Sequence, residues 1–494
     1  MMRLPRQIAA LALAGVMATT AACTRVVNPA TGESELSAVT PQQEKALGAQ
    51  EHPKVLAEFG GAYDDPNLKA YVTNIGQRLA ANSELPDEQF TFTLLDTPVV
   101  NAFALPGGYV YVTRGLLGIL NTEAELAGVM GHEIGHVTAR HGARRQTTGM
   151  VAGILTAGLG ILTGSRQAQQ LGQIAAQGYL ASYSRDHERE ADGLGVRYLS
   201  RTGYDTLAMS HSLDAIGRHS ELLSRASGQE AQGFNFLATH PQTPERVANT
   251  IALARQNPGA GANAIEGRNS YLDAINGMIY GSSPAQGFVR GNRFIHPELR
   301  FAFAFPDGFR VDNLPDAVVG SGPDGTRATF DLERDRDVAG RYRSMSDYIA
   351  RHWARGARGR DLRDTRIGGF PAATAVVFMT AGDGSRFEAQ IAAIRFGPTQ
   401  IFRFMLAAPV QVAERYDRAF ENSIYSFREI DAQEAKAAKP LRVHVMTVRR
   451  GDTVESLARL AGIDSYDVDR FRMINDLAPG EDLVPGRRVK VIRE

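Results

Sequence analysis

The chain has 494 residues, which is enough for about three domains that each bury a core. Lysine and arginine together number 54, as do aspartate and glutamate, so the formal net charge is zero and no strongly basic region indicates a nucleic-acid partner. The 50 glycines are spread along the chain, which excludes a collagen-like or low-complexity protein.

A secretory signal peptide is predicted for residues 1–22. Arg3 and Arg6 precede an apolar run, and the small residues ATTAA lie directly before Cys23, the only cysteine of the chain. The apolar run is too short, and wrongly flanked, for a helix that spans a bilayer. We therefore expect the mature chain to begin at or near Cys23.

The lone cysteine at the cleavage junction resembles a bacterial lipobox, although Thr20 stands where leucine is usual. The resemblance implies a lipid on Cys23, a tether over residues 23–39 and a periplasm-facing protein anchored to the outer membrane. Simple cleavage after Ala22 is the alternative, and it would give a soluble periplasmic or secreted protein.

Residues 40–255 show a mainly helical pattern with a small number of strands, typical of a single domain. The predicted elements are helices from Pro41 and Pro66, strands at 90–95 and within 100–112, and a long helix from Thr122. The apolar run 150–163 is too short to span a bilayer. A buried core helix and a helix that dips into a membrane surface both fit that run.

Three further segments follow this domain. Residues 256–288 are predicted to be a linker with one short helix inside it. The strictly alternating segment 299–305 and later apolar runs predict an α+β domain with an antiparallel sheet over 289–431, with helices at 344–357 and 411–424 and Trp353 in its core. No catalytic constellation is present in that domain, and its role stays open.

Residues 443–494 predict the order strand, helix, helix, strand. This unit resembles the LysM module through Gly451-Asp452-Thr453, Ile474-Asn475 and Pro485-Gly486. The resemblance implies binding of peptidoglycan glycan that contains N-acetylglucosamine. A module that only docks on its own neighbouring domain is the alternative.

The segment VMGHEIGHVTARH at 129–141 carries the chemistry of the chain. His132 and His136 lie about 40° apart around a helix and one turn along it, so both imidazoles can reach one ion. Glu133 projects beside them and can hold a water, as in the H-E-x-x-H signature of zinc proteases. His141 projects about 180° from His132, so it is expected to have a structural role or to lie at the rim.

A catalytic zinc needs a third protein ligand, and SRDHEREAD at 184–192 can supply it. Glu188 and Asp192 lie one turn apart beside the apolar stripe of this helix, whereas Asp186 and Glu190 fall on the polar face. His187 also borders the stripe, so helical phase alone leaves it as a rival of Glu188.

These two motifs together resemble peptidase family M48, the gluzincins that include HtpX-like and BepA-like proteases and the CAAX prenyl endopeptidases. The resemblance implies a mainly α, zincin-like fold with a small sheet. It also implies one Zn²⁺ per chain, held by His132, His136 and Glu188, with Asp192 orienting a ligand histidine. Glu133 would be the general base.

Two further matches to the family add to the expected site. Asn101-Ala102-Phe103 resembles the edge strand that pairs with extended substrate. His240, in His240-Pro241, resembles a residue that can occupy the fourth zinc position, and Arg246 resembles one near the oxyanion. The family's TPR repeats and transmembrane helices have no counterpart in the sequence.

The expected function is a zinc metalloendopeptidase of the bacterial envelope that cleaves misfolded or unassembled envelope proteins. Two alternatives stay open at this stage. One is a chaperone or scaffold whose proteolysis is gated by His240, and the other is a peptidoglycan-directed hydrolase that the LysM-like unit localises.

Overall fold

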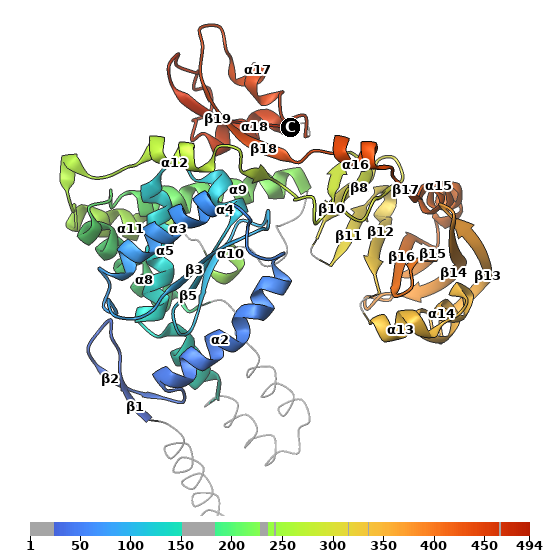
Figure 1. Ribbon diagram of the computed structural model, residues 1–494, viewed down its shortest axis with the longest axis horizontal. Helices are drawn as coiled ribbons and strands as arrows, with labels where there is room; N and C mark the ends of the chain where they lie inside the picture. The colour runs from blue at the N-terminus through green and yellow to red at the C-terminus, as the bar shows by residue number, and fades with distance from the viewer. Residues whose placement is uncertain are drawn as a thin grey trace, which may run out of the picture. The chain divides into compact units, whose positions relative to one another are not determined.

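The computed structural model describes residues 24–150, 183–227, 236–241, 244–314, 316–333, 335–463 and 466–494 (Figure 1). The predicted signal peptide, Cys23 and residues 151–163 of the apolar run lie outside the described residues. Contacts divide the chain into two compact units. The first contains Met1–Tyr280 and Arg442–Arg493, and the second contains Gly281–Leu441 with Glu494.

The first unit is mainly helical, as the sequence predicts. Among the described residues, its helices include α2 (Pro41–Glu58), α3 (Pro66–Ala80), α4 (Arg114–Ile119), α5 (Glu123–Thr138), α8 (Arg185–Thr202), α9 (Ala208–Ser227), α10 (Phe236–Thr239), α11 (Pro244–Gln256) and α12 (Arg268–Ile275). Thr40 starts α2 with a capping box, and Asp65 caps α3 ahead of a proline in its first turn.

A small sheet and the C-terminal elements complete this unit. The sheet has the order β3 (Thr91–Leu95), β5 (Tyr109–Thr113), β4 (Ala102–Leu105), with β3 parallel and β4 antiparallel to β5. The last residues form β18 (Leu441–Thr447), α17 (Val454–Ala458), α18 (Asp467–Ile474) and β19 (Arg488–Arg493). This is the strand, helix, helix, strand order that the sequence predicts for 443–494.

The predicted tether over 23–39 is wrong for residues 24–37, which form a hairpin. Its strands β1 (Thr24–Val27) and β2 (Ser34–Ser37) pair antiparallel, and Gly32 supplies the positive φ of 72° that the turn requires. Asn28 Nδ2 donates to the Ala139 carbonyl at 3.2 Å, which fixes the hairpin on the end of α5. The hairpin could not be predicted from this polar sequence, because the hairpin contacts the rest of the unit mainly through hydrogen bonds and ion pairs.

The predicted linker over 256–288 is also more ordered than its glycine-rich composition indicates. Tyr271, Leu272 and Ile275 of α12 are fully buried, and β6 (Ile279–Tyr280) joins β18 and β19 in one sheet. The short helix expected inside this segment is present. Its apolar residues bind it to the first unit, so it does not behave as a free linker.

The second unit is the antiparallel-sheet domain that the sequence predicts. A four-stranded sheet has the order β17 (Arg428–Glu429), β9 (Phe301–Ala304), β8 (Arg293–His296), β7 (Phe288–Arg290). A seven-stranded sheet has the order β10 (Arg310–Asn313), β11 (Ala317–Ser321), β12 (Arg327–Leu332), β16 (Gln400–Pro409), β15 (Arg386–Gly397), β14 (Phe370–Thr380), β13 (Arg358–Ile367).

Helices cover both faces of the seven-stranded sheet. On one face α15 (Ala413–Tyr425) and a cluster of phenylalanines form the main core. On the other face α14 (Met345–Tyr348) and the π-helical turn Ile349–Trp353 pack on small residues. Two further short helices, α13 (Arg336–Arg341) and α16 (Ala432–Ala437), also belong to this unit.

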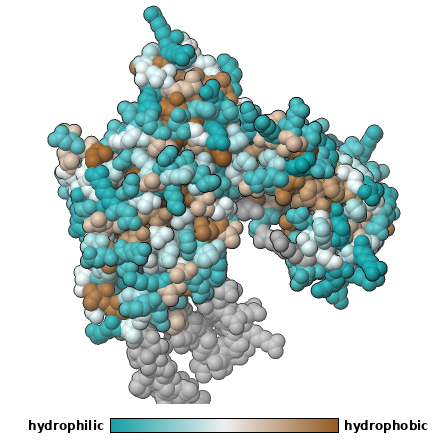
Figure 2. All heavy atoms as spheres, in the orientation of Figure 1, coloured by the Kyte–Doolittle hydropathy of each residue, from teal (hydrophilic) through white to brown (hydrophobic). Residues whose placement is uncertain are grey.

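The visible surface is mostly hydrophilic, and its apolar spots are small and scattered (Figure 2). Within the described ranges, no helix is both long and apolar enough to cross a membrane.

Candidate metal centre and active site

Helices α5 and α8 carry most of the candidate site. Thr122 caps α5 by accepting from the Glu125 amide, and the Glu125 carboxylate accepts from the Asn121 amide at 2.6 Å. Ser184 caps α8 by accepting from the His187 amide, and Gly203 ends the helix in the left-handed region with φ 79°. The H-E-x-x-H segment lies in the middle of α5, where His132 and Glu133 have no exposed surface.

Three glycines allow the two helices to approach closely. A Cβ added to Gly195 would lie 3.1 Å from the His132 amide nitrogen, and one added to Gly131 would lie 3.3 Å from Gly195 Cα. A Cβ on Gly135 would similarly lie 3.1 Å from the Ala191 carbonyl oxygen. This backbone-to-backbone contact brings the buried acids of α8 opposite the histidines of α5.

Four side chains converge on one point that is able to hold a metal. Ligand atoms of His132, His136, Glu188 and His240 all lie within 4.8 Å of one another, and all four residues are buried. The Nε2 atoms of His132 and His136 are 3.0 Å apart, and Glu188 Oε1 lies 3.5 Å from His136 Nε2. His240 Nδ1 lies 3.0 Å from the same carboxylate oxygen.

The chemistry of this donor set fits zinc. Two imidazole nitrogens and a carboxylate oxygen are the ligands that catalytic zinc prefers, with one further position left open. Both carboxylate oxygens of Glu133 are buried without a hydrogen-bond partner among the described residues, and Oε1 lies 3.5 Å from His240 Nε2. A buried carboxylate is costly without a cation or donor nearby, so the site is built for a positive charge and a proton donor beside Glu133.

Asp192 and Arg246 surround the outer side of His132. Asp192 Oδ1 lies 2.9 Å from His132 Nδ1, while Arg246 donates to both oxygens of Asp192 at 2.7 and 2.8 Å. Arg246 also lies 2.7 Å from Glu188 Oε2. The geometry places Asp192 where a carboxylate orients a ligand histidine, and it places Arg246 in a buried ion-pair network with both acids.

The second histidine has an outer partner that sequence reasoning missed. His136 Nδ1 lies 2.8 Å from His141 Nδ1, and His141 Nε2 lies 3.1 Å from Glu190 Oε2. Helical phase assigns Glu190 to the solvent-facing side of α8, but this residue also contacts His141. The sequence signal was HVTARH itself, because the turn at Arg140, with φ 54°, returns His141 toward the metal ligands.

Tyr183 was also missed, and it stacks on the His136 ring with the centroids 4.0 Å apart. His187, the rival of Glu188, stacks on His141 at 4.3 Å. It does not belong to the group of ligand atoms that the described residues bring together. No pattern in the sequence distinguishes Tyr183 from an ordinary core aromatic residue.

Burial shifts the titration of the central groups. Burial raises the pKa of Glu133, which keeps a proton more readily than an exposed glutamate. Burial and the neighbouring His132 lower the pKa of His136, which favours the neutral imidazole that a metal requires. Burial opposes the charged form of His240, but Glu188 and Glu133 outweigh it and raise the pKa of this histidine.

The predicted substrate strand lies at the edge of the small sheet. Ala102 and Phe103 begin β4, which among the described strands pairs only with β5, and Asn101 immediately precedes it. All three residues are buried, and the side-chain atoms of Asn101 have no hydrogen-bond partner among the described residues. Among the described residues, the backbone of β4 is thus paired along one edge only.

A buried two-histidine and glutamate donor set on an H-E-x-x-H helix and a second helix defines the class of zinc metallopeptidases. Residues 66–253 match the model of peptidase family M48. All the candidate metal ligands and the neighbours Asp192 and Arg246 lie inside the matched range.

Curated relatives agree with this assignment. The chain is 32% identical to the beta-barrel assembly-enhancing protease of Yersinia pestis over 237 residues, which cover 46% of this chain and 47% of that protein. It is 31% identical to the protein of the same name from Escherichia coli K12, with the same coverage. It is 29% identical over 224 residues to the mitochondrial metalloendopeptidase OMA1 of Schizosaccharomyces pombe, covering 44% and 63%. The chain thus spans about half the length of the bacterial relatives.

Proposed function

We propose that the chain is a zinc metalloendopeptidase of the bacterial envelope that hydrolyses unassembled or misfolded envelope proteins. The observation that carries the proposal is the buried convergence of His132, His136 and Glu188 beside the carboxylate of Glu133. The names of the bacterial relatives support an envelope substrate, because they refer to assembly of β-barrel proteins. The signal-like segment ahead of Cys23 supports export, with a lipid on that cysteine as the proposed anchor.

In this mechanism His132, His136 and Glu188 hold the metal. A zinc ion at such a site supplies a Lewis acid that polarises a carbonyl oxygen and lowers the pKa of water to about 7. The carboxylate of Glu133 takes the proton of the attacking water and passes it to the leaving amine. Its burial raises the pKa of this carboxyl group, which suits a group that first accepts and then donates a proton.

The surrounding residues position these groups. Asp192 accepts from His132 Nδ1 and so directs Nε2 of the same ring toward the metal. The edge strand β4 offers backbone groups to an extended peptide, which would place a scissile bond beside Glu133. His240 and Arg246 are proposed to stabilise the oxyanion, which requires Arg246 to share its ion pairs with Asp192 and Glu188.

The Glu133→Gln variant tests this proposal directly. The amide that replaces the carboxylate cannot accept the proton of water, so kcat on casein should fall by about 10²- to 10⁴-fold, while the zinc content stays at one per chain. The exposed Glu221→Gln variant on α9 is the matched control and should keep wild-type turnover. Wild-type turnover by Glu133→Gln would reject the assigned base.

A gated state is a second candidate, and the position of His240 favours it. This side chain is fully buried within the ligand cluster, 3.3 Å from His132 Nε2, so it can occupy a metal position. His240→Ala should then raise casein cleavage above the wild-type rate if the resting enzyme is latent. A fall in cleavage would instead assign His240 to the catalytic step.

A further inference from the structure

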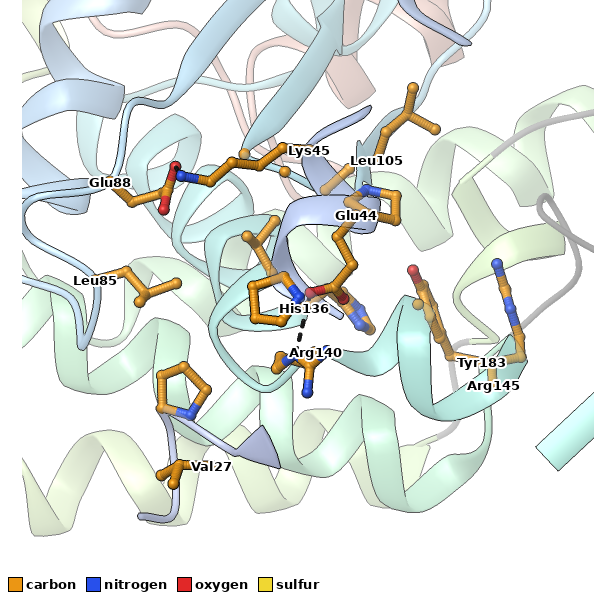
Figure 3. A pocket seen from close by; sticks show the side chains of 18 residues that line it. Val27, Glu44, Lys45, Leu85, Glu88, Leu105, His136, Arg140, Arg145 and Tyr183 are labelled. Carbon is orange, nitrogen blue, oxygen red and sulfur yellow. Dashed lines mark hydrogen bonds and ion pairs between the residues drawn. The ribbon is translucent and has the colours of Figure 1, made fainter. Parts of the chain in front are cut away.

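A cavity beside the candidate metal centre lies where four elements meet (Figure 3). It is bounded by the β1–β2 hairpin, the first turn of α2, the end of β4 and the last turn of α5. We call this cavity the hairpin pocket. His136 lines it on the side of the metal ligands, and Leu105 lines it on the side of the edge strand β4. The cavity therefore borders both a candidate metal ligand and the end of the candidate substrate strand.

The walls of the hairpin pocket are mostly apolar. The side chains that form them come from segments that are distant in the sequence. They are Val27, Pro29, Pro41, Leu85, Leu105 and Pro106. Leu85 is half-buried, and Val27 is 59% exposed, so apolar surface at this cavity is open to an incoming group.

The charged groups of the lining are already engaged with partners. Arg140 Nε lies 3.1 Å from Glu44 Oε2, and Lys45 Nζ lies 2.8 Å from Glu88 Oε1. The guanidinium of Arg145 lies over the Tyr183 ring, 4.6 Å from its centroid. A charged side chain that entered the pocket would have to break one of these pairs, whereas an aliphatic side chain would bury its surface without that cost.

The pocket is held in shape by the residues that follow α5. Arg140 is 4% exposed, and its Nη2 donates to the Val39 carbonyl at 2.8 Å just before α2. The Asn28 amide of the hairpin donates to Ala139. A Cβ on Gly142 would lie 3.2 Å from the Pro106 ring, so the turn after β4 also packs on this segment. Hairpin, α2 and β4 are thus fixed to the end of the helix that carries His136.

We propose that the hairpin pocket is the specificity subsite that receives an aliphatic side chain of the substrate next to the scissile bond. This inference rests on the proposed peptidase function. Because His136 and Leu105 both line the pocket, a side chain inside it belongs to a residue close to the metal on a peptide paired with β4. Leucine, isoleucine, valine and methionine match the apolar walls, and acidic or basic residues do not.

Cleavage-site profiling tests the subsite with the zinc-loaded full chain. The substrate is a library of peptides prepared from an unfolded proteome, and every cleavage site is identified by mass spectrometry. We expect one position beside the scissile bond to be enriched in aliphatic residues by about tenfold, the discrimination that an apolar pocket gives. In Leu85→Lys the same position should lose this enrichment and accept aspartate and glutamate, while the other positions keep their profile.

Two further variants make the result decisive. Val27→Lys changes a pocket residue that is 59% exposed, and it should shift the same position in the same direction. Leu223→Lys, at a 45% exposed site on α9, is the matched control and should leave the profile unchanged. An unaltered profile in both pocket variants overturns the subsite while leaving the peptidase intact. Absence of any cleavage by both the zinc-loaded wild type and the zinc-loaded His240→Ala variant overturns the proposed function, and the subsite with it.

Discussion

Both ring nitrogens of His132 lie next to other side chains of the candidate site. Nδ1 lies 2.9 Å from Asp192 Oδ1, and Nε2 faces His136, Glu188 and His240. Asp192 is 2% exposed, and burial opposes its charged form, but Arg246 and His132 outweigh burial and lower the pKa of Asp192 to about 2. A carboxylate that stays ionised at all ordinary pH values can fix the tautomer of His132 permanently.

Replacing this carboxylate should therefore weaken the metal site without removing a ligand. Asp192→Asn is expected to lower zinc affinity by about 10- to 100-fold, because His132 loses its fixed orientation and Arg246 loses an ionised partner. Competition with a chromogenic chelator measures the affinity. Asp186→Asn changes an exposed aspartate of the same helix and should bind zinc as the wild type does. Equal affinity in both variants would show that Asp192 does not orient His132.

The burial of a single side chain could be predicted where helical periodicity determines it. Contacts that depend on a turn between elements could not be predicted. Helical phase placed Glu188 and Asp192 on the buried side of α8, and both are buried there. His141 lies beyond the end of α5, and Tyr183 lies ahead of the start of α8, so neither contact with His136 follows from the phase of a single helix. A spacing argument follows one helix only, so it cannot predict contacts made by residues beyond the ends of that helix.

At the scale of elements, the approach of α5 to α8 decides whether the ligands meet. Gly131 and Gly195 face one another, and a Cβ at either position would touch backbone atoms that belong to the other helix. Backbone cannot move aside as a flexible side chain can, so a methyl group at Gly195 must push the helices apart by a few tenths of an ångström. That displacement acts directly on the separation of His132 and Glu188.

Gly195→Ala is therefore expected to reduce both zinc affinity and turnover, by about tenfold or more, because catalytic geometry tolerates little displacement. Gly193→Ala offers a matched control on the same helix, since a Cβ there meets nothing within 4 Å. Alanine favours the helix by about 1 kcal/mol over glycine, so the control should be slightly more stable than the wild type. Identical zinc affinity in the two variants would show that the close packing of α5 on α8 is not required to form the metal site.

A pH-sensitive element lies in the second unit, at the end of β8. His296 is 8% exposed, its Nδ1 accepts from the Leu299 amide at 3.2 Å, and burial lowers its pKa to about 4. The unfolded chain protonates this histidine below about pH 6.5, whereas the folded unit does not. The folded state therefore loses stability as the pH falls from about 6.5 toward 4, and not above that range.

Denaturant unfolding should report this loss through Trp353, the only tryptophan of the chain, which lies in the same unit. Between pH 7 and pH 5 the wild-type unit is expected to lose about 2 kcal/mol through His296. His296→Asn keeps an acceptor for the Leu299 amide but does not titrate, so its loss over this range should be smaller by that amount. The same pH dependence in both proteins would assign the loss to other groups.

Element types were predictable along most of the chain, and tertiary partners were not. The helices from Pro41 and Pro66, the strands of the small sheet and the antiparallel second unit follow capping signals and periodicity. The hairpin of 24–37 was missed, and the short helix expected within 256–288 was predicted without its docking on the first unit, because both depend on distant partners. Amino-acid composition indicates only local flexibility. The order of these segments depends instead on the distant residues that their few polar or apolar groups contact.

For the whole molecule, the C-terminal segment is built into the unit that carries the active site. Lys490 of β19 has no exposed surface, and its ammonium donates to the carbonyls of Gly118 and Leu120. Those carbonyls lie at the end of α4, directly before the Asn121–Thr122 start of the H-E-x-x-H helix. This buried lysine therefore connects the C-terminal segment to the loop from which α5 begins.

Lys490→Met should leave these two carbonyls without their donor, at a cost of roughly 1–3 kcal/mol in unfolding free energy. The loss should appear in the first unit, as faster amide exchange at 118–126, and zinc affinity should fall with it. Arg493→Met, an exposed position of the same strand, should leave both unchanged. Unchanged exchange at 118–126 in Lys490→Met would show that the lysine does not secure the start of α5.

The order of the units along the chain indicates which parts the peptidase needs. The second unit, Gly281–Leu441, is inserted between β6 and β18, which are neighbours in one sheet. The Gly277 amide donates to the Val443 carbonyl at 2.7 Å, and the Val443 amide donates to Met278 at 2.9 Å, so the two ends of the insertion are close.

Replacing 281–441 by a short glycine-serine linker should keep zinc binding and peptide cleavage within about threefold of the wild type, because a domain inserted through adjacent ends folds apart from its host. Ending the chain at residue 441 should instead abolish cleavage, because it removes β18, β19 and the buried Lys490 from the first unit. Zinc content and peptide turnover of the two shortened chains decide the matter, and an active chain that ends at 441 would show that the C-terminal segment is dispensable for the active site.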